Sequence, residues 1–553
     1  MKTYNKIWIF ALGAGIAASC SDLDTFPESG IVTEKQKVDV VEANPERLQA
    51  DINSLSTIFT DLLPNSTSAQ TFHNDFSYPA VCIQSDANGA DMISDNSDYE
   101  WFTVGFEYSD RNANYAVPLF TWNFCYKLNK AANDILSTIP EDTEVEELKH
   151  YRGQSLVARA FANFTLAQRF QFTYKGNEEK PTVPIVTWDM PADRTNANPR
   201  ATNAEIYELI YNDLTQAIAD LEGFQRPNKA AIDRSVAYGV RARVNLVMNN
   251  WEEAASDAAA AMQGYNLLTL QDVSAPGFNS AAASSWIWAA LYDAGTVSAN
   301  YRNITWPGHL CSFNMGYTCS QALYKRINSF TYDKIPATDV RKGWWVDSSL
   351  ESPLLDKMNW NGATGSAISS LDIPNVKKPF VPYTNVKFAP YQNNCGTNVN
   401  ASDWCIMRAE EMILIQAEAL AMGGDVAGGR TILENWVKTY RNPEYSCSIS
   451  SPEAFQNEVW LQRRIELWGE GHAYTDIMRL KKNVVRCDKS GKSDYPDAWQ
   501  FNIAADDGIL LYRIPTRETN ANGAIDPIKD NNNEGQFPVH GDGAGLTDGC
   551  VIL

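Results

Sequence analysis

Histidine and cysteine are scarce in this chain of 553 residues, which contains only 5 His and 10 Cys. No CxxC, HExxH, GxSxG or GxxxxGK[ST] motif occurs. These absences argue against a zinc ribbon, a zinc protease, a nucleophile-elbow hydrolase and a P-loop nucleotide site. Cysteine is too sparse for a disulfide scaffold, although Cys311 and Cys319 are close enough in sequence to pair. We expect Cys82 and Cys125 to be buried free thiols.

Long runs of Lys and Arg are also missing, and the formal net charge is −21. Nucleic-acid-binding proteins normally carry a basic surface, so a nucleic acid partner is not expected. The composition is otherwise that of an ordinary globular protein, with 44% hydrophobic and 11% aromatic residues. An acidic, aromatic-rich surface is compatible with neutral sugars or with peptides, and it does not select between them.

The first twenty residues resemble a lipoprotein signal. Lys2 and Lys6 precede an apolar stretch, Ile7–Ile16, and Ala17-Ala18-Ser19 then leads to Cys20. The apolar stretch is shorter than the roughly 20 residues that a membrane span needs. We therefore predict a signal peptide over residues 1–19, lipidation of Cys20 and a tether over residues 20–45, which would anchor the protein without a transmembrane helix.

Helical periodicity dominates most of the remaining chain, so the expected fold class is mainly α. Residues 46–266 and 404–553 are predicted as helical regions, the second ending in a loop tail after Pro515. Residues 267–403 are rich in Gly, Pro, Asn and aromatic residues and are predicted to be irregular and partly β, a type of segment that often carries function. The predicted helices include 148–170, 234–248, 251–263, 404–422, 428–440 and 452–468.

Specific signals support several of these elements. Thr202 and Glu205 form a capping box, in which each side chain satisfies a free backbone N–H. The helices on either side of Trp251 have the large-residue and alanine pattern of a tetratricopeptide hairpin; a generic helical bundle is the alternative. Trp286 and Trp288 alternate like a buried strand. We expect Ser451 to cap the last long helix.

Several separated segments, in order, resemble the SusD/RagB family. The run Gln462–His472, followed by Asp476–Arg479, resembles the family's ERRxELxxEGH…DLxR motif. Gln462 stands where Glu is usual and Ala473 where Arg is common, which bears on helix packing. The irregular middle region matches nothing closely. Further similar segments are Trp122–Leu136, Arg152–Leu166, Arg200–Leu214, Arg408–Ala419 and Tyr512–Pro515.

This resemblance implies a non-enzymatic, cofactor-free helical protein with four tetratricopeptide-like hairpins. Such proteins form a lid on a SusC-type TonB-dependent outer-membrane transporter and capture oligosaccharides or, in RagB-like members, peptides. Asp22 and Asp24 after Cys20 resemble the surface-export signal of Bacteroidetes lipoproteins, so we expect the protein to face the cell exterior. A lipid-anchored glycosidase and an interaction scaffold without a small ligand remain alternatives.

Sugar binding requires exposed aromatic platforms beside polar groups. The resemblance places a ligand-stacking Trp where Trp101 stands, in the segment that also holds Asn96, Tyr99 and Phe102. In the irregular region, aromatic residues lie among asparagines. The alternative for each is packing on the protein body, which we expect for Trp344 and Trp345. The further candidates from the irregular region are Tyr301, Trp306 and Tyr317.

Metal and catalytic interpretations are weaker. Asp530–Gly535 begins like an EF-hand loop, but its twelfth position would be Gly541 instead of the required Glu. Asp86, Asn88, Asp91 and Asp95 could share a structural calcium ion, although a solvated acidic loop is the preferred interpretation. Glu466 and Glu470 could imitate a glycosidase pair. Since they lie in the family's packing helix, we expect them to bind Arg463 or Arg479 instead.

Overall fold

The computed structural model describes residues 34–550 except 195, 296, 298–302 and 372–379. Cys20, the signal peptide and Tyr301 therefore lie outside the described residues. Within the described part the protein is mainly helical, as expected, and its only sheets are three two-stranded ones. No helix in that part is both long and apolar enough to cross a membrane.

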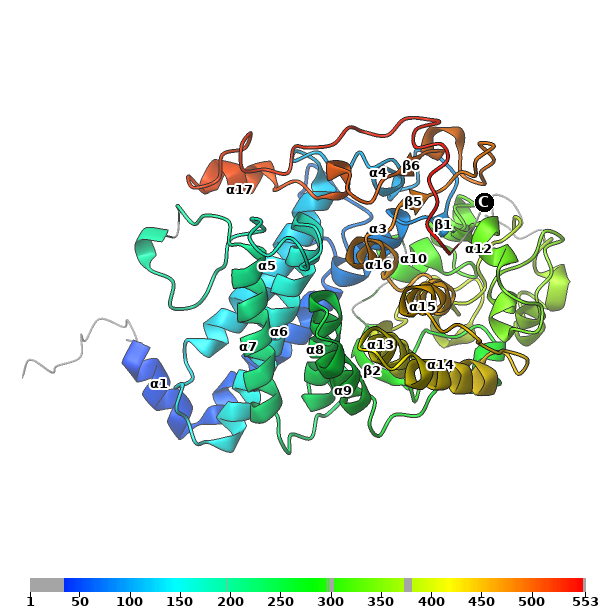
Figure 1. Ribbon diagram of the computed structural model, residues 1–553. Coiled ribbons are helices and arrows are strands. Elements are labelled where there is room, and N and C mark those ends of the chain that lie inside the picture. Colours follow the sequence, from blue (N-terminus) through cyan, green and yellow to red (C-terminus); the bar gives the residue numbers. More distant parts are fainter. Residues whose placement is uncertain (1–33, 195, 296, 298–302, 372–379, 551–553) are drawn as a thin grey trace, which may run out of the picture.

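The long helices pack side by side in chain order (Figure 1). α6 contacts both α5 and α7, α8 contacts both α7 and α9, and α9 then contacts α13 across the long intervening segment. This row confirms the prediction of stacked helices. The helices are α5 Ala116–Leu136, α6 Glu146–Phe170, α7 Asn203–Asp220, α8 Arg234–Met248, α9 Trp251–Ala261, α13 Ala409–Met422, α14 Val426–Tyr440, α15 Pro452–Glu466 and α16 Ala473–Leu480.

Local signals explain where these helices begin and how closely they approach. The capping box is present: Glu205 N–H donates to the Thr202 hydroxyl (3.2 Å), and Thr202 N–H donates to the Glu205 carboxylate (2.8 Å). The Ser451 hydroxyl accepts from Ala454 N–H at the start of α15. At Gly429 an added Cβ would lie 2.4 Å from the Ala417 carbonyl oxygen, so only glycine permits α14 to pack this closely on α13.

Short elements complete the fold and correct two boundaries. α1 begins at Glu34 within the predicted tether, and its Val41 side chain is buried. α17 forms within the predicted loop tail. The short helices are α1 Glu34–Ala43, α2 Gln49–Thr57, α3 Ser77–Ala87, α4 Thr103–Phe106, α10 Trp306–Leu310, α11 Tyr317–Ser320, α12 Ser329–Asp333 and α17 Thr516–Ala521.

The prediction of helix over residues 404–408 is wrong. Trp404–Arg408 forms strand β4, which pairs antiparallel with β2, Trp286–Ala290, and every residue of both strands is buried. A short, continuous apolar run is compatible with a buried strand and with a buried helix. Here the run forms a strand because β2 is available to pair with it. The other strands are β1 Met92–Ile93 with β3 Arg326–Ile327, and β5 Val484–Val485 with β6 Asn502–Ile503.

Buried ion pairs join the irregular region to the C-terminal helices. Glu466 accepts hydrogen bonds from Arg408 (2.8 Å) and from Arg441 (2.8 Å), and Glu470 binds Arg408 and Lys387. The expectation that these two glutamates bind Arg463 or Arg479 is therefore wrong. The Arg408 and Arg441 guanidiniums hold the pKa of Glu466 well below its usual range despite burial, which opposes them.

The cysteines in the described part are all free thiols. Cys82 and Cys125 are buried, which confirms the expectation of buried free thiols, and burial raises the pKa of each to about 12. Cys311 and Cys319, which are close enough in sequence to pair, do not form a disulfide. Instead the Cys311 Sγ donates to the Phe388 carbonyl and the Cys319 Sγ to the Ser312 carbonyl.

Candidate functional site

Trp101 lines a surface groove with a volume of about 580 Å³. Three stretches of chain form it: residues 65–74, the segment from Trp101 into the first turns of α5, and the start of α17. Among its lining residues in the described part, Arg517 is the single charged one. The polar and aromatic lining residues are Asn65, Thr67, Gln70, Phe72, Asn74, Trp101, Asn114, Tyr115, Phe120, Thr516, Arg517 and Asn520.

Neighbours from the 65–74 stretch hold Trp101 in place. The Asn74 side-chain N–H donates to the Trp101 carbonyl (2.9 Å), and the His73 ring stacks on the indole with centroids 4.8 Å apart. Trp101 is half-buried, so one part of its ring is supported while another faces the groove. Tyr115, immediately before α5, is 43% exposed at the same groove. Together they offer aromatic surfaces beside amide and hydroxyl groups.

The structure brings three of the predicted site aromatics together. His73 Nδ1 lies 2.5 Å from the Tyr317 hydroxyl, and the Tyr317 ring is 6.3 Å from that of Tyr99. Tyr99 is 51% exposed, whereas Tyr317 is buried beneath it. Asn96 is exposed on the loop before Tyr99. Trp101, Tyr99 and Tyr317 therefore belong to one aromatic cluster that is linked through His73.

Two predicted ligand contacts are corrected. Phe102 is 1% exposed, and its ring packs against Phe76 and His309. Trp306 is fully buried, and its indole N–H donates to the Ser402 carbonyl (2.9 Å). Neither ring reaches the surface, so neither can form the exposed platform that was expected. Phe102 and Trp306 were predicted as ligand contacts because polar residues lie near them in sequence. Polar neighbours do not determine whether a side chain faces solvent or the core.

Sequence reasoning missed most of the groove. Phe72, Asn74 and Tyr115 were not singled out, and Arg517 and Asn520 lie in a tail that was expected to be loop. The polar run around Tyr115 could have indicated an exposed loop, because it directly precedes the amphipathic helix α5. Nothing local connects it with residues 65–74 or 515–520. The groove depends on tertiary contacts between segments that are far apart in the chain.

The suggested calcium ligands are engaged by the protein itself. Asp86 accepts hydrogen bonds from Gly471 N–H (3.0 Å) and Ala473 N–H (3.2 Å), and Asp91 binds Arg464. Asp95 pairs with Arg326, and the Asn88 amide donates to Gly105. The preferred interpretation, a solvated acidic loop, is therefore wrong for the buried members. In the described part no three His, Cys, Asp or Glu side chains form a cluster that could hold a metal ion.

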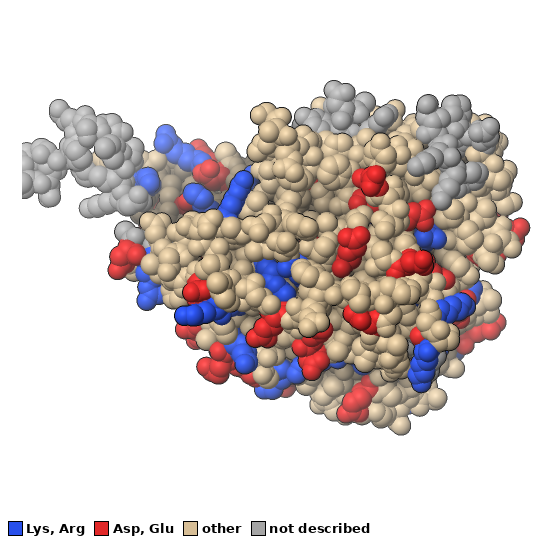
Figure 2. Space-filling view, turned by 90° about the horizontal axis from the view of Figure 1, so that it is seen from above, with Lys and Arg blue, Asp and Glu red and all other residues tan. Residues whose placement is uncertain are grey.

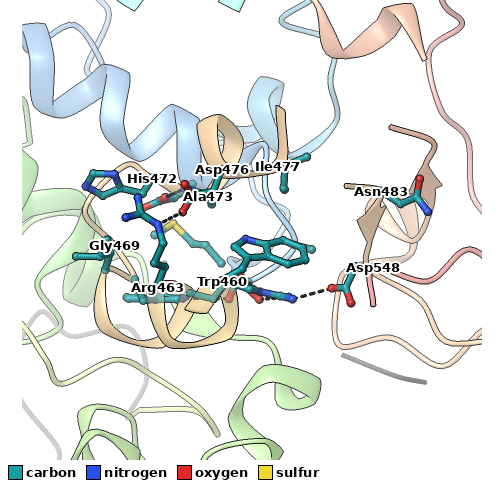
Figure 3. Close-up of a pocket in the computed structure, with 16 residues that line it drawn as sticks. Trp460, Arg463, Gly469, His472, Ala473, Asp476, Ile477, Asn483 and Asp548 are labelled. Carbon is teal, nitrogen blue, oxygen red and sulfur yellow. Dashed lines mark hydrogen bonds and ion pairs between the residues drawn. The ribbon is translucent and has the colours of Figure 1, made fainter. Parts of the chain in front are cut away.

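The interior also contains a cavity of about 20 Å³ at the junction of α15 and α16 (Figure 3). The arginines that line it pair with carboxylates: Arg463 with Asp476, and Arg464 with Asp91 and Asp548. This volume accommodates roughly one water molecule. It is therefore too small for a sugar or a peptide, and the open Trp101 groove is the better candidate ligand site.

The groove lacks the groups that glycoside hydrolysis requires. Retaining and inverting glycosidases use two carboxyl groups on opposite sides of the scissile bond. No Asp or Glu is found among the residues that line the groove in the described part. The described lining offers aromatic rings, neutral hydrogen-bonding groups and one guanidinium, that of Arg517.

Comparisons with known proteins agree with this fold. A SusD-like family described as "Starch-binding associating with outer membrane" matches residues 44–246, and the SusD family matches residues 313–533. No curated protein gives a significant match. A SusD-like carbohydrate-binding protein from Bacteroides vulgatus has a similar structure (TM-score 0.69, 22% identity), covering 86% of this chain and 96% of that chain.

Two further solved structures show the same fold. A SusD superfamily protein from Bacteroides thetaiotaomicron aligns with a TM-score of 0.64 and 20% identity, over 87% of this chain and 98% of that chain. A laminarin-binding SusD-like protein aligns with a TM-score of 0.58 and 17% identity, over 86% and 97%. The stacked helical pairs thus define a tetratricopeptide-like helical protein. The chain belongs to the SusD/RagB family.

Proposed function

We propose that this protein binds a neutral oligosaccharide in the Trp101 groove and delivers it to a SusC-type TonB-dependent transporter. In this proposal lipidated Cys20 anchors it in the outer membrane, facing the cell exterior. The groove itself is the observation that carries the proposal, since it combines Trp101 and Tyr115 with amides, hydroxyls and a single cation. Relatives whose names include carbohydrate binding and laminarin binding share the fold.

The chemistry of the groove suits a sugar. The CH-rich face of a pyranose packs on an indole or phenol ring, and its hydroxyls both donate and accept hydrogen bonds. The side-chain amides of Asn65, Asn114 and Asn520 carry both hydrogen-bond donors and acceptors. The Arg517 guanidinium carries donors only. The proposal also includes Tyr99 and Asn96, which are exposed and would extend the binding surface beyond Trp101. Tyr317 is 6% exposed and would support the Tyr99 ring without touching the ligand itself.

Isothermal calorimetry tests the binding. The soluble protein, starting at Ser21, is titrated with neutral oligosaccharides of defined linkage and with peptides. Trp101→Ala should weaken the affinity for the bound glycan by about 10- to 100-fold, the value expected for loss of one buried aromatic platform. Trp188→Ala is the matched control, because Trp188 is 45% exposed and does not line the groove.

The outcomes separate the alternatives. Binding of peptides alone would replace the glycan proposal with capture of peptides on the same scaffold. Equal affinity in Trp101→Ala and wild type would show that the ligand does not bind in this groove. Release of shorter sugars during incubation would indicate a glycosidase. Copurification with a TonB-dependent transporter, and cleavage by protease added to intact cells, test the delivery step and the outward orientation.

A further inference from the structure

A second cavity, of about 60 Å³, lies where α6, α8 and α13 meet the α15–α16 turn. Four arginines line it: Arg169 from α6, Arg243 from α8, Arg463 from α15 and Arg479 from α16. The helices come from both of the regions that match the family, residues 44–246 and residues 313–533. Groups bound in this cavity would therefore touch both helical parts of the molecule.

Three of these arginines are matched by carboxylates. Arg243 binds Glu411 at 2.6 Å, and Arg479 binds Glu418 at 2.6 Å. Arg463 binds Asp476 at 2.7 Å, and Figure 3 shows its guanidinium directed toward this carboxylate. Three positive charges thus face three negative ones.

Arg169 differs from the other three. It is 4% exposed, yet no carboxylate of the described part lies within ion-pair distance of it. Within the described residues its side chain makes one hydrogen bond, from Nη1 to the Thr165 carbonyl (3.0 Å), and its Nε–H has no acceptor. In the same cavity, Nη1 of Arg463 also lacks an acceptor within the described residues, and Arg463 is likewise 4% exposed. Both residues line the same cavity.

The other groups that line or surround the cavity do not pair with Arg169. The Glu470 carboxylate lines the cavity but binds Lys387 and Arg408 instead. The nearby thiols of Cys82 and Cys125 and the hydroxyl of Tyr474 stay neutral at pH 7, because burial raises the pKa of each to about 12. His472 also lines the cavity, and burial lowers its pKa to about 4, so it is neutral too. A guanidinium stays charged in a protein, and a buried charge without a counterion is costly.

We propose that the cavity binds a small monovalent anion, chloride, between Arg169 and Arg463. The anion accepts hydrogen bonds from the two unpartnered N–H groups and balances the one unmatched positive charge. A spherical ion fits a cavity of this size, whereas a sugar does not. Since the ion contacts α6 and the α15–α16 turn at once, it stabilises the packing between them. This site is independent of the glycan groove.

Calorimetric melting tests the site. Sodium chloride replaces sodium gluconate at constant ionic strength, because gluconate is too large for the cavity. The Tm of wild type should rise by about 1 °C for each tenfold increase in chloride above its Kd. Arg169→Met should abolish this rise. Arg47→Met, the same change at an exposed arginine, should keep it.

Crystals grown in sodium bromide give a direct measurement on the wild-type protein. An anomalous peak within hydrogen-bonding distance of Arg169 Nε and Arg463 Nη1 would place the anion. A water molecule there without an anomalous peak would overturn the proposal, as would a halide-dependent Tm that survives in Arg169→Met. If Arg169→Met does not fold, the bromide measurement alone decides.

Discussion

His309 shows how strongly burial controls a single ionisable residue in this protein. It is 1% exposed behind the aromatic cluster, and its Nε2 lies 3.0 Å from both the His73 and Asn303 carbonyls. Burial, with a smaller contribution from Lys325, lowers its pKa to about 3. Below pH 6.5 the unfolded chain therefore takes up a proton at this position that the native state does not.

This difference predicts the pH dependence of stability. Because the unfolded state binds one more proton at pH values between 6.5 and about 3, the native state loses stability as pH falls through that range. Replacing His309 with Gln, which retains an N–H donor, should reduce the slope of the unfolding free energy against pH by about 1.4 kcal/mol per pH unit. Urea midpoints at pH 6.0, 5.2 and 4.5 measure the slope.

The slope is the informative quantity, because His309→Gln also removes ring packing and lowers stability at every pH. His540→Gln is the control, since His540 is exposed. Parallel curves for wild type and His309→Gln would show that the proton is taken up equally in both states, and the buried neutral histidine would be refuted.

Residue types were easier to predict than side-chain directions. Trp101, which the family resemblance singled out, lines the groove, and its contact with a ligand stays a prediction. Its neighbour Phe102 points the opposite way into the core, and Trp306 is buried although asparagine surrounds it in sequence. A loop has no fixed periodicity, so sequence cannot state which of two adjacent aromatics faces solvent. Tertiary contacts with Phe76, His309 and Ser402 decide it.

At the scale of elements, sequence determined the long helices well and the short segments poorly. α8 has the predicted bounds, 234–248, because an Asp cap and a left-handed Asn249 mark its ends. Trp404–Arg408 was assigned to a helix and is a strand, since its buried run has no periodicity of its own. Its partner β2 lies over one hundred residues earlier, beyond the reach of local signals.

The capping box at the start of α7 yields a prediction at this scale. Thr202 and Glu205 satisfy each other's backbone N–H groups, and α7 packs on both α6 and α8. Thr202→Ala should therefore lower the free energy of unfolding by about 1 kcal/mol, as measured by urea titration. Thr431→Ala in the middle of α14, where the hydroxyl bonds only its own helix, is the control. Equal effects of the two substitutions would contradict a specific capping contribution.

For the whole molecule, the ordered family segments predicted the architecture, whereas the contacts that join its parts were not predictable. The buried ion cluster gathers Arg341 and Lys387 from the irregular region, Arg408 from β4 and Arg441 from the end of α14 around Glu466. Charged residues are common on helix surfaces, so their pattern alone gave no reason to place these in the core. Glu466 was paired with the wrong arginines for that reason.

Glu466 is the acceptor on which this cluster depends. It is fully buried and bonded to Arg341, Arg408 and Arg441. Glu466→Gln removes the negative charge and leaves three arginines with less compensation. Breaking a buried ion pair in this way costs about 3–5 kcal/mol. Urea titration at pH 7 should show this loss for Glu466→Gln and almost none for Glu208→Gln, an exposed residue of α7.

The advantage of wild type over Glu466→Gln should depend on pH with a definite sign. The three arginines hold the native pKa of Glu466 well below its usual value of 4.5. The stabilisation is therefore complete above pH 4.5 and declines as pH falls below it, because the unfolded chain then takes up the proton first. The difference in urea midpoint between the two proteins should shrink from pH 6 to pH 3. A difference that stays constant over this range would mean that the substitution acts through packing, and that the ionised carboxylate does not join the irregular region to the helices.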